Sequence, residues 1–140
     1  MSFGNDISKF VDKTEGKMEK VVKMSFIQLS ANVIRRSPVG NPSIWKGSAP
    51  KGYAGGRFRA NWQASIGSPV SGEVDSTSAS VATGSVINAT KRFGDYYLMN
   101  NLPYAKRLEE GHSRQASDGI VKLAVAEWSS IVRIITGLVK

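Results

Sequence analysis

The sequence contains no cysteine and a single histidine, His112. Without cysteine, a disulfide framework, a thiolate metal site and a thiol nucleophile are all excluded. One histidine leaves only carboxylates to complete a metal site, and the residues around His112 have no recognised ligand spacing. No apolar run approaches the roughly 20 residues needed to span a bilayer, and no basic-then-apolar signal opens the chain. We therefore expect a protein made in the cytoplasm, with no metal, no cofactor and no membrane partner.

Acidic residues are missing from one stretch of this basic chain. The formal net charge is +8, and no acid lies between Arg35 and Arg59. The bases in this stretch are Arg35, Arg36, Lys46, Lys51, Arg57 and Arg59. Because these bases cannot neutralise one another, we expect an acidic partner outside the chain, either nucleic acid or carboxylates of an adjoining protein. The alternative is a solvated loop that keeps the protein soluble.

Length and composition indicate a single folded domain, residues 1–140. A chain of 140 residues buries one core, and its hydrophobic content of 41% and charged content of 21% are near the averages for globular proteins. The apolar patterns predict an α+β fold. It would contain a long N-terminal helix, a small mainly antiparallel sheet with a short helix, and a C-terminal amphipathic helix.

The N-terminal helix is predicted over residues 6–36, where apolar residues recur three and four apart. Asp6 is a candidate N-cap and Pro38 a stop. Gly16 weakens the middle of this helix, so a start as late as Thr14 is the alternative.

The central part is expected to contain strands and short helices. Alternation over residues 56–70, with Asn61 on the polar side, predicts a half-buried strand or a short helical segment followed by one. A loop, a helix over residues 85–92 capped by Ser85, a strand over 95–100 and a two-turn helix over 104–110 follow.

The last helix is predicted from about Ile120 to Leu138, with Ser117 as its cap. Both long helices have apolar residues on more than one face. Phe26 and Ile27 show this in the first helix, and Leu123 and Ile134 in the second. We expect these residues to seal contacts between subunits.

Residues 37–56 form a long, basic loop rich in proline and glycine. Loops of this length in compact domains are usually functional or disordered. This one contains Trp45 and Tyr53, large side chains that indicate a segment ordering against a partner. Packing on its own domain is the alternative.

Catalysis has one candidate group, His112 beside Glu109, Glu110 and Ser113. Residues adjacent in sequence rarely converge on one substrate atom, so we expect no enzyme. A cell-wall hydrolase also lacks its separated carboxylate pair. Non-specific DNA binding is the stronger alternative, because the basic stretch is interleaved with Trp45, Tyr53 and Phe58. No familiar DNA-reading motif accompanies it.

Two segments together resemble a known family. The first is "RRSPVG" followed, after an insertion, by "GGRFRANWQASIG", and the second is "NNLPYAKRLEEGHSRQASDGIV". They resemble the tail-completion and neck (head–tail joining) proteins of long-tailed bacteriophages, a group that includes lambda-type minor tail protein Z. The matching positions are Ser37, Pro38, Val39, Gly56, Arg57, Phe58, Arg59 and Trp62 in the first segment, and Pro103, Tyr104, Ala105, Leu108, Glu109, Gly111, Ser113, Gln115, Ala116 and Gly119 in the second.

The resemblance implies a structural virion protein of the phage neck, located at the head–tail junction. It would form a homo-oligomeric ring, commonly six-fold, as a tail-completion or tail-terminator protein. Its partners would be further copies of itself, a head-completion or connector protein and a tail-tube or tail-terminator protein, with DNA passing through the lumen. A small basic non-specific DNA-binding protein is the alternative function.

The resemblance also implies roles for single residues. Tyr104 would pack the short helix on the sheet, and Gly111 would turn the chain. Glu109 and a buried, neutral His112 would form hydrogen bonds across the turn or across a subunit boundary. The expected partner and interface residues are Arg35, Arg36, Trp45, Lys46, Lys51, Tyr53, Arg57, Phe58, Arg59, Tyr104, Arg107, Glu109 and His112.

Overall fold

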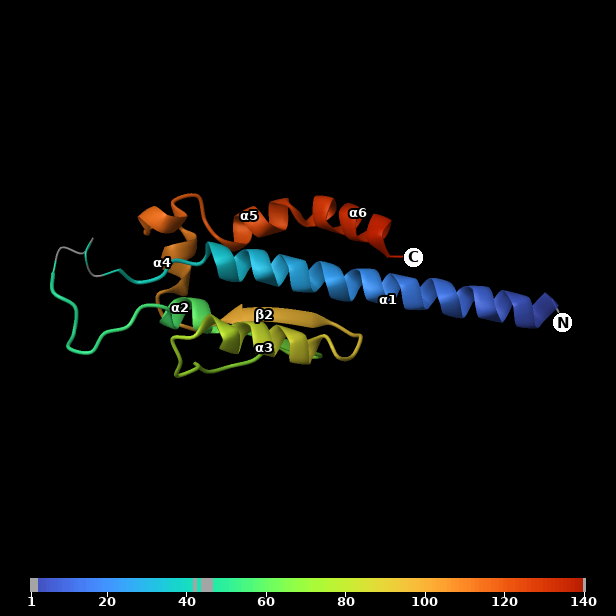
Figure 1. Cartoon of the computed structure of the whole chain (residues 1–140), viewed down its shortest axis with the longest axis horizontal. Helices are drawn as coiled ribbons and strands as arrows, with labels where there is room; N and C mark the ends of the chain where they lie inside the picture. The colour runs from blue at the N-terminus through green and yellow to red at the C-terminus, as the bar shows by residue number, and fades with distance from the viewer. Residues whose placement is uncertain (1–2, 42, 44–46, 140) are drawn as a thin grey trace.

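Helix α1 (Phe3–Arg36) runs between two layers of shorter elements (Figure 1). The computed structural model describes residues 3–41, 43 and 47–139. On one side of α1 lie α5 (Val121–Ala126) and α6 (Trp128–Leu138). On the other lie a two-stranded sheet and α3 (Ala79–Ala89). The predicted α+β class, with a long helix at each end and a small sheet, is confirmed, although the C-terminal helix is divided.

The sheet consists of β1 (Trp62–Ile66) and β2 (Tyr96–Asn100). The strands are antiparallel, with Trp62 opposite Asn100 and Ile66 opposite Tyr96. A short helix, α2 (Arg57–Ala60), leads directly into β1. Of the two sequence interpretations of residues 56–70, the helical segment followed by a strand is therefore correct.

Helix α1 begins earlier than the sequence predicts. It starts at Phe3, so Asp6 lies in its first turn and is not the N-cap. Gly16 does not interrupt it. A glycine costs about 1 kcal/mol relative to alanine in a helix interior, which is too little to break a helix that continues on both sides.

Helix α3 also begins earlier, at Ala79, so Ser85 is an interior residue and not a cap. The Ser85 hydroxyl faces the sheet and accepts a hydrogen bond from the Ala64 backbone N–H at 2.5 Å. The buried residues of α3 are Ala82, Val86 and Ala89. Their three- and four-residue spacing is helical, but two of them are alanines, so the apolar signal in the sequence is weak.

The C-terminal segment contains two helices, because α5 and α6 are separated at Glu127. They follow α4 (Ala105–Glu109) and a short 3₁₀ helix, η2 (Arg114–Ala116). Ser117 is the residue after η2 and does not cap α5, which corrects the predicted cap. No helix among the described residues is both long and apolar enough to cross a membrane.

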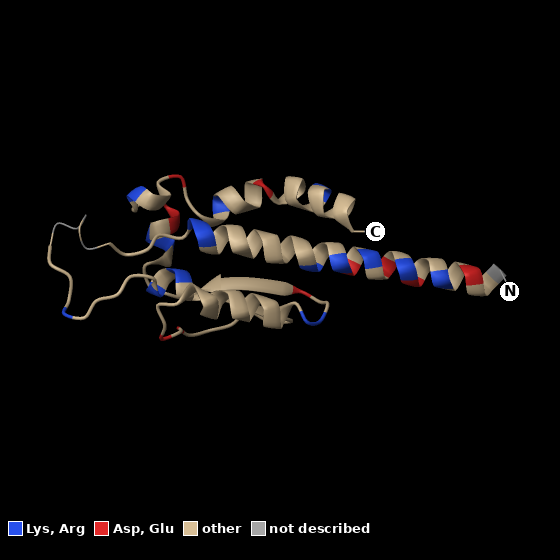
Figure 2. Ribbon diagram, in the orientation of Figure 1, with Lys and Arg blue, Asp and Glu red and all other residues tan. Residues whose placement is uncertain are grey.

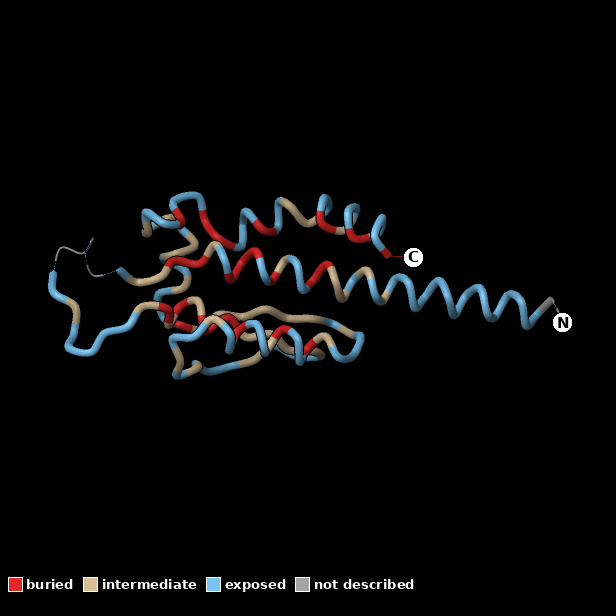
Figure 3. The backbone as a smooth tube through the Cα atoms, in the orientation of Figure 1, coloured by how far each residue is buried: buried red, intermediate tan, exposed pale blue. Residues whose placement is uncertain are grey.

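The core lies where α1 meets the sheet, α3 and α5, as the buried segments in Figure 3 show. Phe26, predicted to lie in a subunit contact, is instead 7% exposed and stacks on Tyr96 with ring centroids 4.9 Å apart. A second, smaller cluster joins Val21, Met24 and Leu29 of α1 to α6. The buried residues of the main cluster are Phe26, Val33, Ile34, Phe58, Trp62, Ala82, Val86, Leu102, Ala116, Ile120 and Ala124.

Candidate functional site

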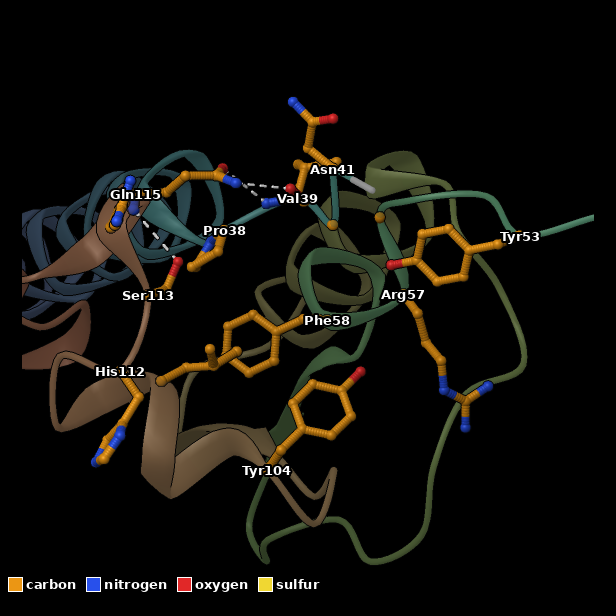
Figure 4. A pocket seen from close by; sticks show the side chains of 14 residues that line it. Pro38, Val39, Asn41, Tyr53, Arg57, Phe58, Tyr104, His112, Ser113 and Gln115 are labelled. Atoms are coloured by element: carbon orange, nitrogen blue, oxygen red, sulfur yellow. Dashed lines mark hydrogen bonds between the residues drawn. The ribbon is translucent and has the colours of Figure 1, made fainter. Parts of the chain in front are cut away.

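The two segments that carry the family resemblance meet at one pocket (Figure 4). Its volume is about 600 Å³. Residues 38–41 and 53–58, from the two ends of the basic loop, form one side, and residues 104–115 form the other. The lining residues are Pro38, Val39, Gly40, Asn41, Tyr53, Gly56, Arg57, Phe58, Tyr104, Leu108, His112, Ser113, Arg114 and Gln115.

Gln115 fixes the start of the basic loop. Its side-chain oxygen accepts from the Val39 backbone N–H at 3.0 Å, and its side-chain nitrogen donates to the Val39 carbonyl at 2.8 Å. The side-chain amide thus pairs with both backbone polar groups of Val39, as the backbone of a neighbouring strand would. Gln115 in turn is placed by Ser113, whose hydroxyl accepts from the Gln115 backbone N–H at 3.2 Å.

The end of the loop lies close to its start. The Tyr53 hydroxyl and the Gly55 backbone both lie against Gly40, so that a Cβ atom at Gly40 would clash with the phenol. A Cβ at Gly55 would clash with the Gly40 carbonyl. A glycine is therefore required at position 55, where the two ends of the loop cross, and the loop is closed at its base.

Arg59 closes the C-terminal end of α1. Its guanidinium donates to the Ser37 carbonyl at 2.7 Å and to the Arg35 carbonyl at 3.0 Å. The last carbonyls of a helix have no partner within the helix, so a cation that binds them is stabilising. Arg59, predicted as a partner residue, thus has a structural role in the folded chain.

The expectation that the basic residues lack acidic partners within the chain is wrong at two positions. Arg36 forms an ion pair with Glu127, the residue between α5 and α6. Arg57 pairs with Glu73 at 2.8 Å and lies 3.7 Å from Asp75. These acids follow the basic stretch in sequence but fold back onto it, which charge counting along the chain could not show.

The other basic and aromatic residues of the stretch are more accessible. Arg35 and Lys51 are exposed, and Arg35 also donates to the Asn32 side chain at 3.0 Å. Tyr53 is 39% exposed at the pocket. Trp45 and Lys46, predicted as partner residues, lie outside the described residues.

Phe58 and Tyr104 form the aromatic floor of the pocket, with ring centroids 6.1 Å apart. Phe58 is 5% exposed and packs edge-on against Trp62, whereas Tyr104 is 39% exposed. Burial raises the pKa of the Tyr104 phenol, and the nearby Arg57 guanidinium opposes that rise. The accessible aromatic face here is therefore that of Tyr104.

Glu109 caps α5 from the preceding helix. One carboxylate oxygen accepts from the backbone N–H groups of Ile120 and Val121 at 3.0 and 2.8 Å, and the other from that of Lys122 at 2.9 Å. A negative charge at the first N–H groups of a helix is stabilising. The predicted hydrogen bonding of Glu109 across the turn is confirmed, within one chain.

His112 and Arg107 are both exposed. The prediction of a buried His112 is therefore wrong. Gly111, with a φ of +88°, turns the chain so that the histidine side chain leaves the corner (Figure 4). Within the described residues, no group of three or more histidine, aspartate or glutamate side chains is arranged to hold a metal ion.

Two polar residues of this region were not selected from the sequence. Gln115 belongs to the matched segment, and a functional role could have been inferred from that. Asn61, assigned to the polar side of the strand, is fully buried. Its side chain accepts from the Val74 N–H at 2.7 Å and donates to the Val74 and Arg57 carbonyls. The alternation placed Asn61 among the exposed polar residues, so nothing in the sequence indicated its burial.

No protein-family model, no curated protein and no solved structure matches this chain. The geometry of the site and the residues themselves therefore carry the functional argument.

Proposed function

We propose that this protein is a structural component of the neck of a long-tailed bacteriophage, a tail-completion or tail-terminator protein that joins the tail to the DNA-filled head. One observation carries the proposal. The two segments that resemble the family, separated in sequence by residues 68–99, lie side by side around a single pocket. Two segments that form one surface are expected to serve one function, and their shared pocket supports such a common function.

The exposed apolar side chains fit a protein that works in an assembly. Ile27 of α1 and Leu123 of α5 are 39% and 36% exposed, and Ile134 and Leu138 of α6 are 60% and 67% exposed. Apolar side chains that gather on helix faces often mark protein contacts. We expect further copies of this chain to cover them in a closed ring.

The basic loop would provide the contact with the adjoining connector or tail protein. It presents the exposed Lys51 and Tyr53 beside a pocket with an accessible aromatic floor. Aromatic residues are the side chains that most often dominate binding energy at interfaces. Carboxylates on the adjoining ring would complement the bases that remain exposed.

DNA binding is less well supported by the structure than by the sequence. Of the six bases in the stretch, Arg36 and Arg57 are paired with acids, and Arg59 binds helix carbonyls. A groove that follows a phosphate backbone needs accessible cations. If the isolated protein nevertheless bound random duplex tightly with a steep dependence on salt, the DNA-binding alternative would be preferred.

The location of the protein in the particle tests the proposal. Virions carrying an affinity tag after the last residue can be disrupted into heads and tails and labelled with gold. We expect label at the head-proximal end of the tail or at the portal vertex of the head, and none along the tail or over the capsid faces. Label elsewhere, or none on intact particles and their parts, would contradict it.

A further inference from the structure

The first part of α1 extends beyond the rest of the molecule. Every residue from position 4 to position 18 is exposed, and the segment projects past the end of α6 and past the sheet (Figures 1 and 3). We refer to residues 4–18 as the helical arm. At about 1.5 Å per residue it is about 22 Å long.

An apolar stripe runs along the helical arm. Ile7, Phe10, Val11 and Met18 are three, one and seven residues apart and fall on one face of the helix. They are 47%, 70%, 43% and 63% exposed. Val21 continues this stripe toward the body, where it packs against the α6 cluster. The same stripe is thus covered by a helix where α6 reaches it and is bare where α6 has ended.

The arm is poorly suited to stand alone in water. In proteins most of the stability of a helix comes from packing of its apolar face, and the apolar side chains of the arm are exposed. The arm also contains Gly16, which costs about 1 kcal/mol relative to alanine in a helix interior. A second helix packed on the stripe would supply the missing stabilisation.

The charges beside the stripe indicate which helix fits. At about 100° per residue, Asp12 and Glu15 lie on one side of the stripe. Lys13 and Lys17 lie on the other side together with Asp6, so this flank still carries a net positive charge. Figure 2 shows both signs along the arm. When two such arms pack in parallel, the acidic flank of each faces the basic flank of the other. When they pack antiparallel, like charges face each other.

We propose that the helical arm binds the helical arm of a second copy of this chain, side by side and in parallel. The apolar stripes supply the contact, and the charged flanks select the orientation, which is the usual role of charge at an interface. The inference rests on the proposed function only for the number of copies in the assembly. Parallel arms are compatible with successive subunits around a ring axis. The pairing itself is expected in the purified protein, without any other component.

The first test measures self-association of the full-length protein by sedimentation velocity over a range of concentrations. We expect oligomers, and we expect Phe10→Glu with Met18→Glu to weaken association by at least about tenfold. The matched control is Ile87→Glu on α3, where Ile87 is 55% exposed and far from the arm in sequence. A wild-type protein that stays monomeric, or a control that dissociates as strongly as the arm variant, overturns the proposal.

Charge reversal tests the orientation. Asp12→Lys with Glu15→Lys makes both flanks basic, and Lys13→Glu with Lys17→Glu makes both acidic. Each variant alone should associate more weakly than wild type, and an equimolar mixture of the two should recover association. The variant with all four substitutions should associate as wild type does, because its flanks are exchanged but still complementary. If this fourfold variant remains as weak as the two double variants, parallel pairing is wrong.

Cross-linking gives a second, independent readout, because the chain contains no cysteine. Gly4→Cys should form disulfide-linked dimers under mild oxidation, since parallel arms bring the two copies of position 4 together. Gly84→Cys, at an exposed and uncrowded position of α3, is the control and should remain monomeric. No cross-link at position 4 in a protein that does oligomerise would place the contact elsewhere. Arm pairing in solution together with absence from the neck would reject the proposed function alone.

Discussion

Gln115 and Val39, which are 76 residues apart in sequence, exchange two hydrogen bonds of 3.0 and 2.8 Å. This pair joins the two segments that resemble the tail-completion family and holds the start of the basic loop against the corner that follows α4. These two hydrogen bonds therefore fix the position of the start of the loop on the molecule.

Replacing Gln115 with alanine should release this base. We expect faster hydrogen exchange at the Val39 backbone N–H and faster proteolysis within residues 37–56, because the loop loses its two anchoring bonds. Gln63→Ala is the matched control, since the Gln63 side chain donates to the Gly72 carbonyl in a different loop. Equal rates of loop cleavage in the wild type and in Gln115→Ala would show that the anchor does not restrain the loop.

Glu109→Ala should destabilise the fold by about 1–2 kcal/mol, because three backbone N–H groups at the start of α5 lose a charged acceptor. Urea denaturation followed by circular dichroism measures this change. Glu110→Ala is the control, because Glu110 is exposed and its carboxylate forms just a long, exposed ion pair of 3.8 Å with the Lys106 ammonium group. It should change stability by less than about 0.5 kcal/mol. Similar losses in both variants would contradict the capping role.

Replacing the buried serines Ser37 and Ser30 with alanine should change the stability of the protein by different amounts. The Ser37 hydroxyl accepts from the Trp62 indole N–H at 2.6 Å and donates to the Val33 carbonyl at 2.7 Å, so Ser37→Ala leaves a buried donor unsatisfied. We expect a loss of about 1–3 kcal/mol. The fully buried Ser30 hydroxyl has no partner among the described residues, so Ser30→Ala should be neutral or stabilising. Thermal unfolding of both variants measures the difference. The reverse order would refute this assignment.

Alanine substitutions at Gly56 and Gly67 distinguish the cost of a steric clash from the cost of a strained backbone. Both have positive φ, +113° and +87°, so alanine is strained at either position. At Gly56 an added Cβ would also clash with the Thr77 carbonyl, whereas at Gly67 nothing lies within 4 Å. Gly56→Ala should therefore lower the melting temperature several degrees more than Gly67→Ala does. Equal shifts would mean that the loop at Thr77 moves aside at little cost.

The sequence was sufficient to predict the elements that depend on strong apolar periodicity. Helix α1, the strand at β2 and the final helical region all follow from spacing and side-chain type. It did not predict the start of α3, because Ala82 and Ala89 give a weak apolar signal although both are buried. It also missed the break at Glu127, since the apolar pattern continues through it.

The site shows a different limit. The two matched segments could be identified from the sequence, but their meeting at one pocket depends on the chain reversal between β1 and β2. Glu109 rather than Ser117 caps α5 because a carboxylate from the preceding helix reaches the same N–H groups, a contact between residues 11 to 13 positions apart. The ion pairs of Arg36 and Arg57 likewise join residues that sequence order separates.

The most direct test of the central claim is electron microscopy of particles made by a phage that lacks this protein. Because a neck protein acts only when finished heads and finished tails join, we expect DNA-filled heads and complete but unattached tails, with infectivity restored by the wild-type chain supplied in the host. Infectious particles with joined heads and tails in the absence of the protein would contradict its assignment to the neck.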